Sequence, residues 1–386
     1  RRTTMSASAP LGSPSTNTGS EEAAVTSAII VGEVVSEVMS HAAATSFIHR
    51  VRFAAIHTSH SMRKVGSRSG AHAEVALICE SMNRLHASPY LLLTLTSFFW
   101  SLNWVIGKAV VGTISPLFLT FIRWVIAVAA MMPFAWPLIR DHWPVVRANW
   151  KPIVLIGFWG TGLHNAFAYV GLHYTTATNG VILNSSIPVL IIVTGWILYR
   201  DTITRVQALG VVVSLAGVLS VLTGGDLRLL ATLTLNKGDV IVIVGMVFWA
   251  VYTVLLRLKP AELPGLALLA CCGVVGVVLL APLAAAEFLF WGGSVALTPA
   301  SFAAMLYVGI VPSFLGYVFW NRAVAEVGSN VAGIFIHLMP AFGSLLAWMF
   351  LGERIRAFHV VGIALILAGV WLTARGRRVV PVPDTE

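Results

Sequence analysis

PVLIIVTGWILYRDTITRVQALGVVVSLAGV occupies residues 188–218, and a related stretch, PAFGSLLAWMFLGERIRAFHVVGIALILAGV, occupies residues 340–370. Composition alone would give roughly two or three identities over this length. Paired without a gap, eight of the 31 positions are identical: Pro188 with Pro340, Trp196 with Trp348, Ile203 with Ile355, Gly210 with Gly362, and the four residues of the closing LAGV. Each copy consists of two apolar stretches joined by a short charged turn, which predicts a chain built by duplication of an apolar helical unit.

The composition of the 386 residues is that of a membrane protein, because 57% are hydrophobic and only 11% are charged. Soluble domains carry about a quarter charged residues. We therefore expect the formal net charge of +9 to come from Lys and Arg in loops and tails, where these residues set the orientation in a lipid bilayer. We expect no nucleic-acid partner. The three cysteines, Cys79, Cys271 and Cys272, offer neither a disulfide framework nor a metal-binding spacing. We expect no cofactor and no metal.

The first 88 residues differ from the rest of the chain in being rich in Ser, Thr and Ala. An apolar patch within residues 24–48 is interrupted by Glu33 and Glu37, which makes it too short and too charged to span a bilayer. We therefore expect residues 1–88 to be a disordered or non-native extension, with the native start near Met82.

From Tyr90 onward the chain is a series of apolar runs of about 20 residues, the length that a helix needs to cross a bilayer. We predict an all-α multi-pass membrane protein of ten transmembrane helices in two inverted five-helix repeats, residues 89–229 and 230–375, followed by a basic cytoplasmic tail, residues 376–386. The first five predicted spans cover residues 90–109, 115–138, 152–173, 178–199 and 205–223. The second five cover residues 239–257, 264–287, 299–320, 328–351 and 355–374.

The odd number of spans in each repeat requires the second repeat to enter the membrane upside down relative to the first. Secondary transporters use such inverted repeats and bind their substrate between the two halves. Lys and Arg in the loops and tail that this arrangement assigns to the cytoplasm outnumber those on the outer side by eleven to five. This excess favours a topology with both termini inside the cell.

Arg123, in FLTFIRWVIAV, lies about eight residues into the second predicted span. An arginine at this depth costs roughly 2.5–3.5 kcal/mol on insertion scales, so it is expected to avoid lipid. One interpretation is that its side chain reaches the outer headgroups or a helix end. The other is that it forms an electropositive wall of a central cavity for anionic or zwitterionic solutes. The corresponding position of the second repeat is Cys271, which favours the second interpretation.

The first span of each repeat carries an aromatic patch. The first patch contains Trp100, Asn103 and Trp104, and the second contains Trp249 and Tyr252. Such residues often form belts at the membrane interface, but an amide beside two indoles can also stack on and hydrogen-bond a solute. We include all five among the candidate cavity residues.

Polar residues also lie inside the third, fourth and ninth predicted spans: His164, Asn165, Asn184, Ser185 and His337. The last three lie within about a turn before a proline, where polar groups can satisfy the backbone carbonyl that proline leaves unpaired. The alternative is that they line the cavity. Ser185 corresponds to His337 in the second repeat, and we expect the two positions to converge if the repeats pack face to face.

Pro188 and Pro340 are candidate hinges, because proline inside a helix removes one backbone hydrogen bond. The remaining charges are expected to be structural. Asp201 and Glu353 are interpreted as charges at the start of the last helix of each repeat. Glu287 and the similarly placed Glu326 are expected to be solvated at span ends, so no carboxylate is expected deep in a span.

Several stretches together resemble the EamA family of the drug/metabolite transporter superfamily. They are FFWSLNWVIGKAV (98–110), Arg123, YTTATNGVILNSSIPVL (174–190), and the charged turn followed by LAGV in both copies. The resemblance covers residues 89–375, and the N-terminal extension has no counterpart in that family. It implies a ten-helix inner-membrane carrier that moves small metabolites such as amino acids or drugs.

The sequence lacks the motifs of nucleotide-driven pumps and of intramembrane proteases, so we do not expect an enzyme. We expect a secondary or facilitative transporter, most simply an exporter, that binds its solute between spans 1–4 and 6–9 and works by alternating access. Spans 5 and 10 would support the fold or form a homodimer. The alternative is a membrane structural or signalling subunit without transport.

Overall fold

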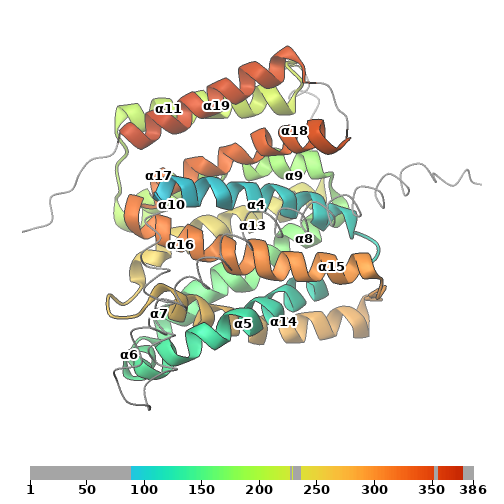
Figure 1. Cartoon of the computed structure of the whole chain (residues 1–386), viewed down its shortest axis with the longest axis vertical. Helices are drawn as coiled ribbons and strands as arrows, with labels where there is room; N and C mark the ends of the chain where they lie inside the picture. Colours follow the sequence, from blue (N-terminus) through green and yellow to red (C-terminus); the bar gives the residue numbers. More distant parts are fainter. Residues whose placement is uncertain (1–87, 227, 229–235, 352–354, 377–386) are drawn as a thin grey trace, which may run out of the picture.

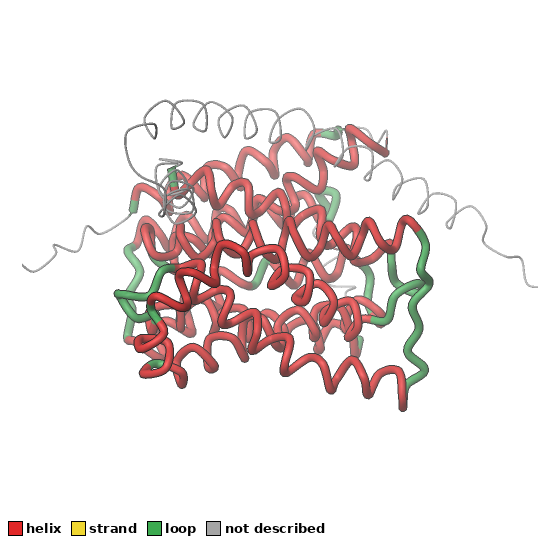
Figure 2. The backbone as a smooth tube through the Cα atoms, turned by 60° about the horizontal axis from the view of Figure 1, so that its bottom comes forward, coloured by secondary structure: helices red, strands yellow, loops and turns green. Residues whose placement is uncertain are grey.

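The computed structural model describes residues 88–226, 228, 236–351 and 355–376. Within these ranges the chain is a bundle of helices whose connections gather at its two ends (Figure 2), with one isolated β-bridge, between Ile114 and Val295. The extension before Ser88, with the expected start at Met82, and the tail after Gly376 lie outside the described residues.

The first repeat forms five helical segments that correspond to the five predicted spans. They are α4 (Pro89–Ala109), α5 (Pro116–Asp141), α7 (Trp150–Gly157) continued by the π-helix η3 (Phe158–Leu163) and α8 (His164–Tyr174), α9 (Ala177–Asn184) followed by α10 (Ile187–Tyr199), and α11 (Arg205–Leu222). The short α6 (Trp143–Ala148) joins the second segment to the third. Two starts have clear local causes: Pro116 occupies the first turn of α5, and Thr204 caps α11 in a capping box with Gln207.

The second repeat has the same order of segments. They are α13 (Lys237–Leu255) with the 3₁₀ turn η4 (Leu256–Leu258), α14 (Gly265–Phe290), α15 (Pro299–Val308) continued by the π-helix η5 (Gly309–Leu315) and α16 (Gly316–Val327), α17 (Ser329–Ile334) followed by η6 (Phe335–His337) and α18 (Leu338–Leu351), and α19 (Ala357–Arg375). The third segment of each repeat therefore contains a π-helical stretch at an equivalent place, a feature frequent at functional sites.

Nine helices of the described part are long and apolar enough to cross a membrane. The fourth predicted span is divided into α9 and α10 by a turn at Ser185–Ser186, just before the proline that we expected to act as a hinge. Pro188 explains the break, since its ring has no N–H to donate to the carbonyl four residues earlier. The predicted end of the eighth span at residue 320 is wrong. Helix α16 continues to Val327, and Arg322 pairs with Glu326 one turn later on its surface.

The two closing helices, α11 and α19, lie side by side at the edge of the bundle, at the top of Figure 1. Gly210 of α11 faces Gly369 of α19, and Gly217 faces Gly362, so the two helices run antiparallel. A Cβ atom on Gly210 would lie 2.7 Å from the carbonyl oxygen of Gly369, which means that only glycine allows this approach. Gly210 and Gly362 are equivalent in the duplication, so the packing is the symmetric contact that an inverted repeat produces.

Equivalent residues of the two repeats also meet at the centre of the bundle. Asn165 donates a hydrogen bond from Nδ2 to the hydroxyl of Tyr317 (3.0 Å), and His337 donates from Nε2 to the carbonyl of Ser185 (2.9 Å). Both pairs are separated by the 152 positions of the duplication. Contact between equivalent positions is possible only near the axis that relates the two halves, which places the centre of the molecule between these pairs.

Candidate functional site: a polar cavity between the two repeats

A cavity lies between the repeats and encloses about 530 Å³, including its open mouth. Eight of the residues predicted from the sequence line it: Trp100, Asn103, Trp104, Arg123, His164, Asn165, Asn184 and Trp249. Seven further lining residues were not predicted: Ala168, Tyr169, Leu172, Ile187, Tyr317, Ile336 and Met339. Ser185, Tyr252 and His337 do not line it, although all three are buried close to the lining residues.

Arg123 is the central polar residue of this cavity and is only 1% exposed. Its Nε donates to Ser313 Oγ (2.7 Å), and its Nη1 donates to Asn165 Oδ1 (2.9 Å) and to the hydroxyl of Tyr169 (2.9 Å). The interpretation that Arg123 reaches the headgroups is therefore wrong, because its guanidinium is held inside the protein. The serine belongs to the π-helix η5 of the opposite repeat, so the arginine ties the two halves together.

The network continues beyond Arg123 through neutral groups. The hydroxyl of Tyr169 donates to Asn103 Oδ1 (2.8 Å) and the hydroxyl of Tyr317 donates to the carbonyl of Gly160 (3.1 Å). Tyr169 follows Asn165 by four positions and shares its helix face, which is the signal that could have identified it. Tyr317 could have been found as the residue equivalent to Asn165 in the second repeat.

The charge of Arg123 has no compensating carboxylate in the described part of the chain. All three hydrogen-bond acceptors around it are neutral, and no Asp or Glu lines the cavity. Burial of an ion without a counter-ion is costly. The third nitrogen, Nη2, makes no hydrogen bond to a described residue. It is also not one of the solvent-inaccessible polar atoms that lack a partner. The guanidinium therefore has one donor nitrogen unused by the described residues, and none of these residues supplies a carboxylate to balance its charge.

His164 adds a hydrogen-bond acceptor to the wall. Its Nδ1 lies 2.7 Å from the carbonyl oxygen of Gly245 in α13. A carbonyl only accepts, so Nδ1 carries a proton, and in the neutral form of the ring Nε2 is an acceptor. The ring packs against Trp249, with 4.8 Å between their centroids.

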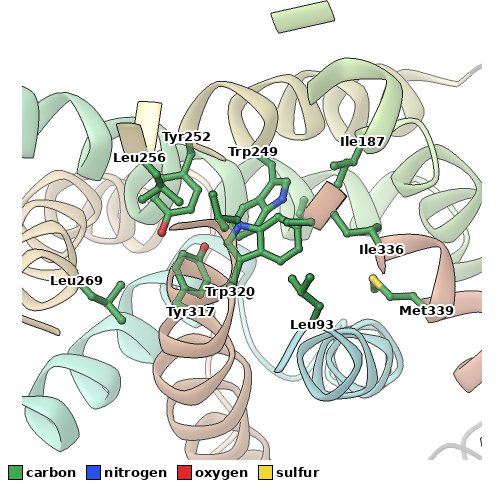
Figure 3. Close-up of a cluster of buried hydrophobic side chains, with 14 of the residues drawn as sticks. Leu93, Ile187, Trp249, Tyr252, Leu256, Leu269, Tyr317, Trp320, Ile336 and Met339 are labelled. Carbon is green, nitrogen blue, oxygen red and sulfur yellow. The ribbon is translucent and has the colours of Figure 1, made fainter. Parts of the chain in front are cut away.

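Aromatic side chains form the apolar part of the cavity and its floor. Trp249, Tyr252, Tyr317 and Trp320 gather in one cluster (Figure 3), and Trp249 lies 4.9 Å edge-on from Trp100. The alternative that the aromatic patches are interfacial belts is wrong for Trp249 and Tyr252, which are buried inside the bundle. Tyr252 lies behind the lining, against Trp249 and Tyr317, and its hydroxyl donates to Asn321 Oδ1 (2.7 Å).

Both candidate hinges follow an irregular stretch of the helix that carries them. Pro188 is in the first turn of α10, after the turn at Ser185–Ser186, and Pro340 is the third residue of α18, after the 3₁₀ turn η6. His337 joins the two stretches, because its Nε2 donates to the carbonyl of Ser185 and its Nδ1 lies 2.7 Å from Ser214 Oγ in α11. Ser185 and His337 thus connect these helices to one another rather than facing a solute.

The structure corrects the reading of two carboxylates. Glu287 is not solvated: it is 7% exposed and accepts hydrogen bonds from the backbone N–H groups of Leu117 (3.2 Å) and Phe118 (2.8 Å) at the start of α5. Asp201 does not cap α11, because it accepts two hydrogen bonds from Arg257 of the opposite repeat, one of them 2.9 Å long. Glu353 lies outside the described residues.

Comparisons with known proteins agree with this architecture. The sequence model of the EamA-like transporter family matches residues 87–223 and 236–375. The chain is 29% identical over 307 residues to the uncharacterized transporter YyaM of Bacillus subtilis, covering 78% of this chain and 98% of that protein. It is 27% identical over 229 residues to a probable terminal-alkyne amino-acid exporter of Streptantibioticus cattleyicolor, covering 58% and 74%.

A solved crystal structure shares the fold with a TM-score of 0.59 at 19% identity, covering 74% of this chain and 96% of that one. The two family matches fall on the two structural repeats and together span most of the chain. The relatives are transporters. The chain therefore belongs to the EamA-like transporter family, and it is a multi-pass membrane transporter rather than an enzyme.

Proposed function

We propose that the protein is a secondary or facilitative carrier that exports a small metabolite across the cell inner membrane by alternating access. The observation that carries the proposal is the position of the cavity. Both repeats line it, it adjoins the contacts between equivalent residues, and it contains a buried cation with no counter-ion among the described residues. Inverted-repeat carriers bind their substrate at such a place and open it to one side at a time.

An ion pair at one end of the bundle supports alternating access. Arg257, after the end of α13, pairs with Asp201, after the end of α10, and lies 3.5 Å from Ser329 Oγ at the start of α17. The pair of Arg257 with Asp201 joins the two repeats, and Tyr252 with Asn321 lies between this pair and the cavity. At the opposite end the lining reaches Leu172, two residues before the end of α8. We take the ion pair to close the carrier at the Arg257 end, although a hydrogen bond from Thr175 to Asp239 also joins the repeats at the opposite end.

The direction and the topology belong to the same proposal. The excess of basic residues in the loops at the Arg257 end supports a cytoplasmic location for that end and for both termini, so the described conformation would face outward. Export is supported by the relative that is named an exporter. The outer faces of α11 and α19 remain available for a homodimer, since each helix uses its glycine face for the other.

The experiment is efflux from proteoliposomes that contain the purified protein and are loaded with radiolabelled amino acids and other small metabolites. Efflux of at least one solute is expected to exceed that from protein-free liposomes and to saturate with concentration. It is also expected to accelerate when the same unlabelled solute is placed outside, because exchange is characteristic of a carrier. Flux of no solute in either direction would contradict the proposal and favour a membrane subunit without transport.

A further inference from the structure

We propose that the connection between α5 and α7 binds the headgroup of an anionic phospholipid. The binding surface, the Trp–basic surface, consists of Trp143, Arg147, Trp150 and Lys151 on the short helix α6 and the start of α7. It lies on the outside of the bundle, where α6 forms a corner beside α5 and α7 (Figure 1). The proposal therefore concerns neither the solute in the cavity nor the direction of transport.

The side chains of this connection repeat every seven residues. One position of the period is a tryptophan that is more than half exposed: Trp136, Trp143 and Trp150. Another is a buried aliphatic residue: Ile139, Val146 and Ile153. The aliphatic residues hold the connection against the bundle, so the tryptophans are presented on its outer side.

The two corners that bound α6 are built in the same way. His142 and Asn149 have nearly the same backbone conformation, with φ −107° and ψ 20° in the first and φ −110° and ψ 27° in the second. A side-chain nitrogen of each lies within hydrogen-bond distance of the carbonyl oxygen four residues earlier, at 2.8 Å and 2.9 Å. Each corner is followed directly by an exposed tryptophan, Trp143 or Trp150, so the fold places the two rings on fixed turns.

The position of the Trp–basic surface favours a lipid over a soluble partner. The helices on either side of α6, Pro116–Asp141 and Trp150–Tyr174, are both long and apolar enough to cross a membrane. The short helix between their ends therefore lies at the depth of the headgroups. Indole rings prefer this depth, because the ring is apolar and its N–H remains in contact with water or polar headgroups.

The charge of the surface favours an anionic headgroup. Arg147 and Lys151 are exposed, and neither has a carboxylate partner among the described residues. Arg140, by contrast, has the carboxylate of Asp141 3.5 Å from its Nε. Lys151 Nζ lies 5.9 Å from the centre of the Trp150 ring, so cation and indole belong to one surface. Basic side chains beside a membrane attract anionic lipids, whereas the ammonium of a zwitterionic headgroup would oppose these two charges.

The second repeat shows that the fold does not require this surface. The equivalent connection, between α14 and α15, covers residues 291–298 and contains Trp291 but no Lys or Arg. It is instead tied to the first repeat, where the backbone N–H of Ser115 donates to the carbonyl of Ser294 (3.0 Å). The two unpaired cations are therefore a property of one repeat, at one end of the bundle.

The test is native mass spectrometry of the purified full chain in detergent, titrated with phosphatidylglycerol or with phosphatidylcholine of the same acyl chains. The unaltered protein is expected to retain phosphatidylglycerol at about tenfold lower lipid concentration, because two basic residues near a membrane surface contribute about this much or more. In Arg147→Gln/Lys151→Gln the two lipids are expected to bind alike. The comparison of lipids on the unaltered chain does not depend on the folding of a variant.

Arg140→Gln/Arg205→Gln is the control matched in charge. It removes two exposed cations from the same end of the bundle and leaves the Trp–basic surface intact, so it is expected to keep the preference for phosphatidylglycerol. Equal retention of both lipids by the unaltered protein would overturn the proposal. An equal loss of preference in the two double variants would also overturn it, because the attraction would then come from the total charge of this end.

Discussion

Arg123 is a cation inside a membrane protein whose hydrogen-bond partners, Ser313, Asn165 and Tyr169, are all neutral. The three partners come from both repeats, so the position of the guanidinium depends on how the two halves meet. A change in the relative position of the halves would alter this hydrogen bonding. The residue that we propose to attract the solute is therefore also the residue that would sense the proposed conformational change.

Replacement of Arg123 by Gln is expected to reduce transport by about tenfold or more, because it removes the charge and the free donor face while preserving a polar side chain. Arg140→Gln is the matched control, since Arg140 belongs to the same helix and its side chain is 59% exposed at the far end. Efflux from proteoliposomes with equal amounts of each folded variant provides the measurement. Full transport by Arg123→Gln would reject a role for this side chain in the cavity.

Glu287 illustrates a charge whose role is local stability. Its carboxylate accepts from two backbone N–H groups in the first turn of α5, where the helix dipole favours a negative charge. Glu287→Gln is expected to lower the stability of the protein in detergent by roughly 0.5–2 kcal/mol, seen as a lower Tm. Glu326→Gln, at an exposed surface ion pair, is expected to shift the Tm little. Equal effects of the two substitutions would contradict the assigned cap.

The sequence alone was sufficient to single out Arg123, because an arginine within an apolar span is costly to expose to lipid and must therefore face protein or water. It was not sufficient to find Tyr169 or Tyr317, since tyrosine is common in membrane spans. These two tyrosines belong to the cavity because their hydroxyls hydrogen-bond residues of other helices. Glu287 was misread for a related reason. A carboxylate near a span end is usually solvated, and only the packing of α14 against the start of α5 removes it from water.

At the level of helices, the duplicated stretch (residues 188–218 and 340–370) produces the same two features in each repeat. The proline of each repeat follows an irregular stretch, a turn before Pro188 and a 3₁₀ turn before Pro340, and the LAGV segment of each repeat lies in a helix that packs glycine against glycine. From the sequence, these stretches were predicted only as hinges within the spans. The sequence shows where proline removes a backbone hydrogen bond, but not whether the helix is interrupted at that point. The pairing of α11 with α19 was not predicted, since similar small residues also occur on lipid-facing helices.

The glycine contact makes a testable prediction for these elements. Gly210→Ala would place a Cβ atom 2.2 Å from Thr373 Oγ1 and 2.7 Å from the carbonyl oxygen of Gly369. Separation of α11 from α19 is expected to cost about 1–3 kcal/mol, measured as a lower Tm. Gly265→Ala is the control, because a Cβ atom there meets nothing within 4 Å. If Gly210→Ala is as stable as the control, the close contact of the two helices is not present in the membrane.

For the molecule as a whole, the duplication accounts for the arrangement of the helices, and the proposed function depends on residues at which the two repeats differ. Equivalent residues meet at Asn165–Tyr317 and Ser185–His337, as the inverted repeat requires. Arg123 has no counterpart, since Cys271 occupies the equivalent position. The ion pair of Asp201 with Arg257 likewise joins the repeats in the described conformation. A carrier of this kind would interconvert by exchanging the contacts that close one end for contacts at the other.

The most direct test of this account is the reactivity of a single cysteine in the cavity from each side of the membrane. Ala168→Cys, in a chain whose three native cysteines are replaced by alanine, places a thiol among the lining residues. In oriented proteoliposomes, a membrane-impermeant maleimide is expected to react faster from the side at which α8 ends. Adding Arg257→Ala, which removes the ion pair at the opposite end, is expected to raise the reaction rate from the Arg257 side and to lower it from the other side. Unchanged rates on both sides, or a rise on one side without a fall on the other, would contradict an alternating-access carrier built around this cavity.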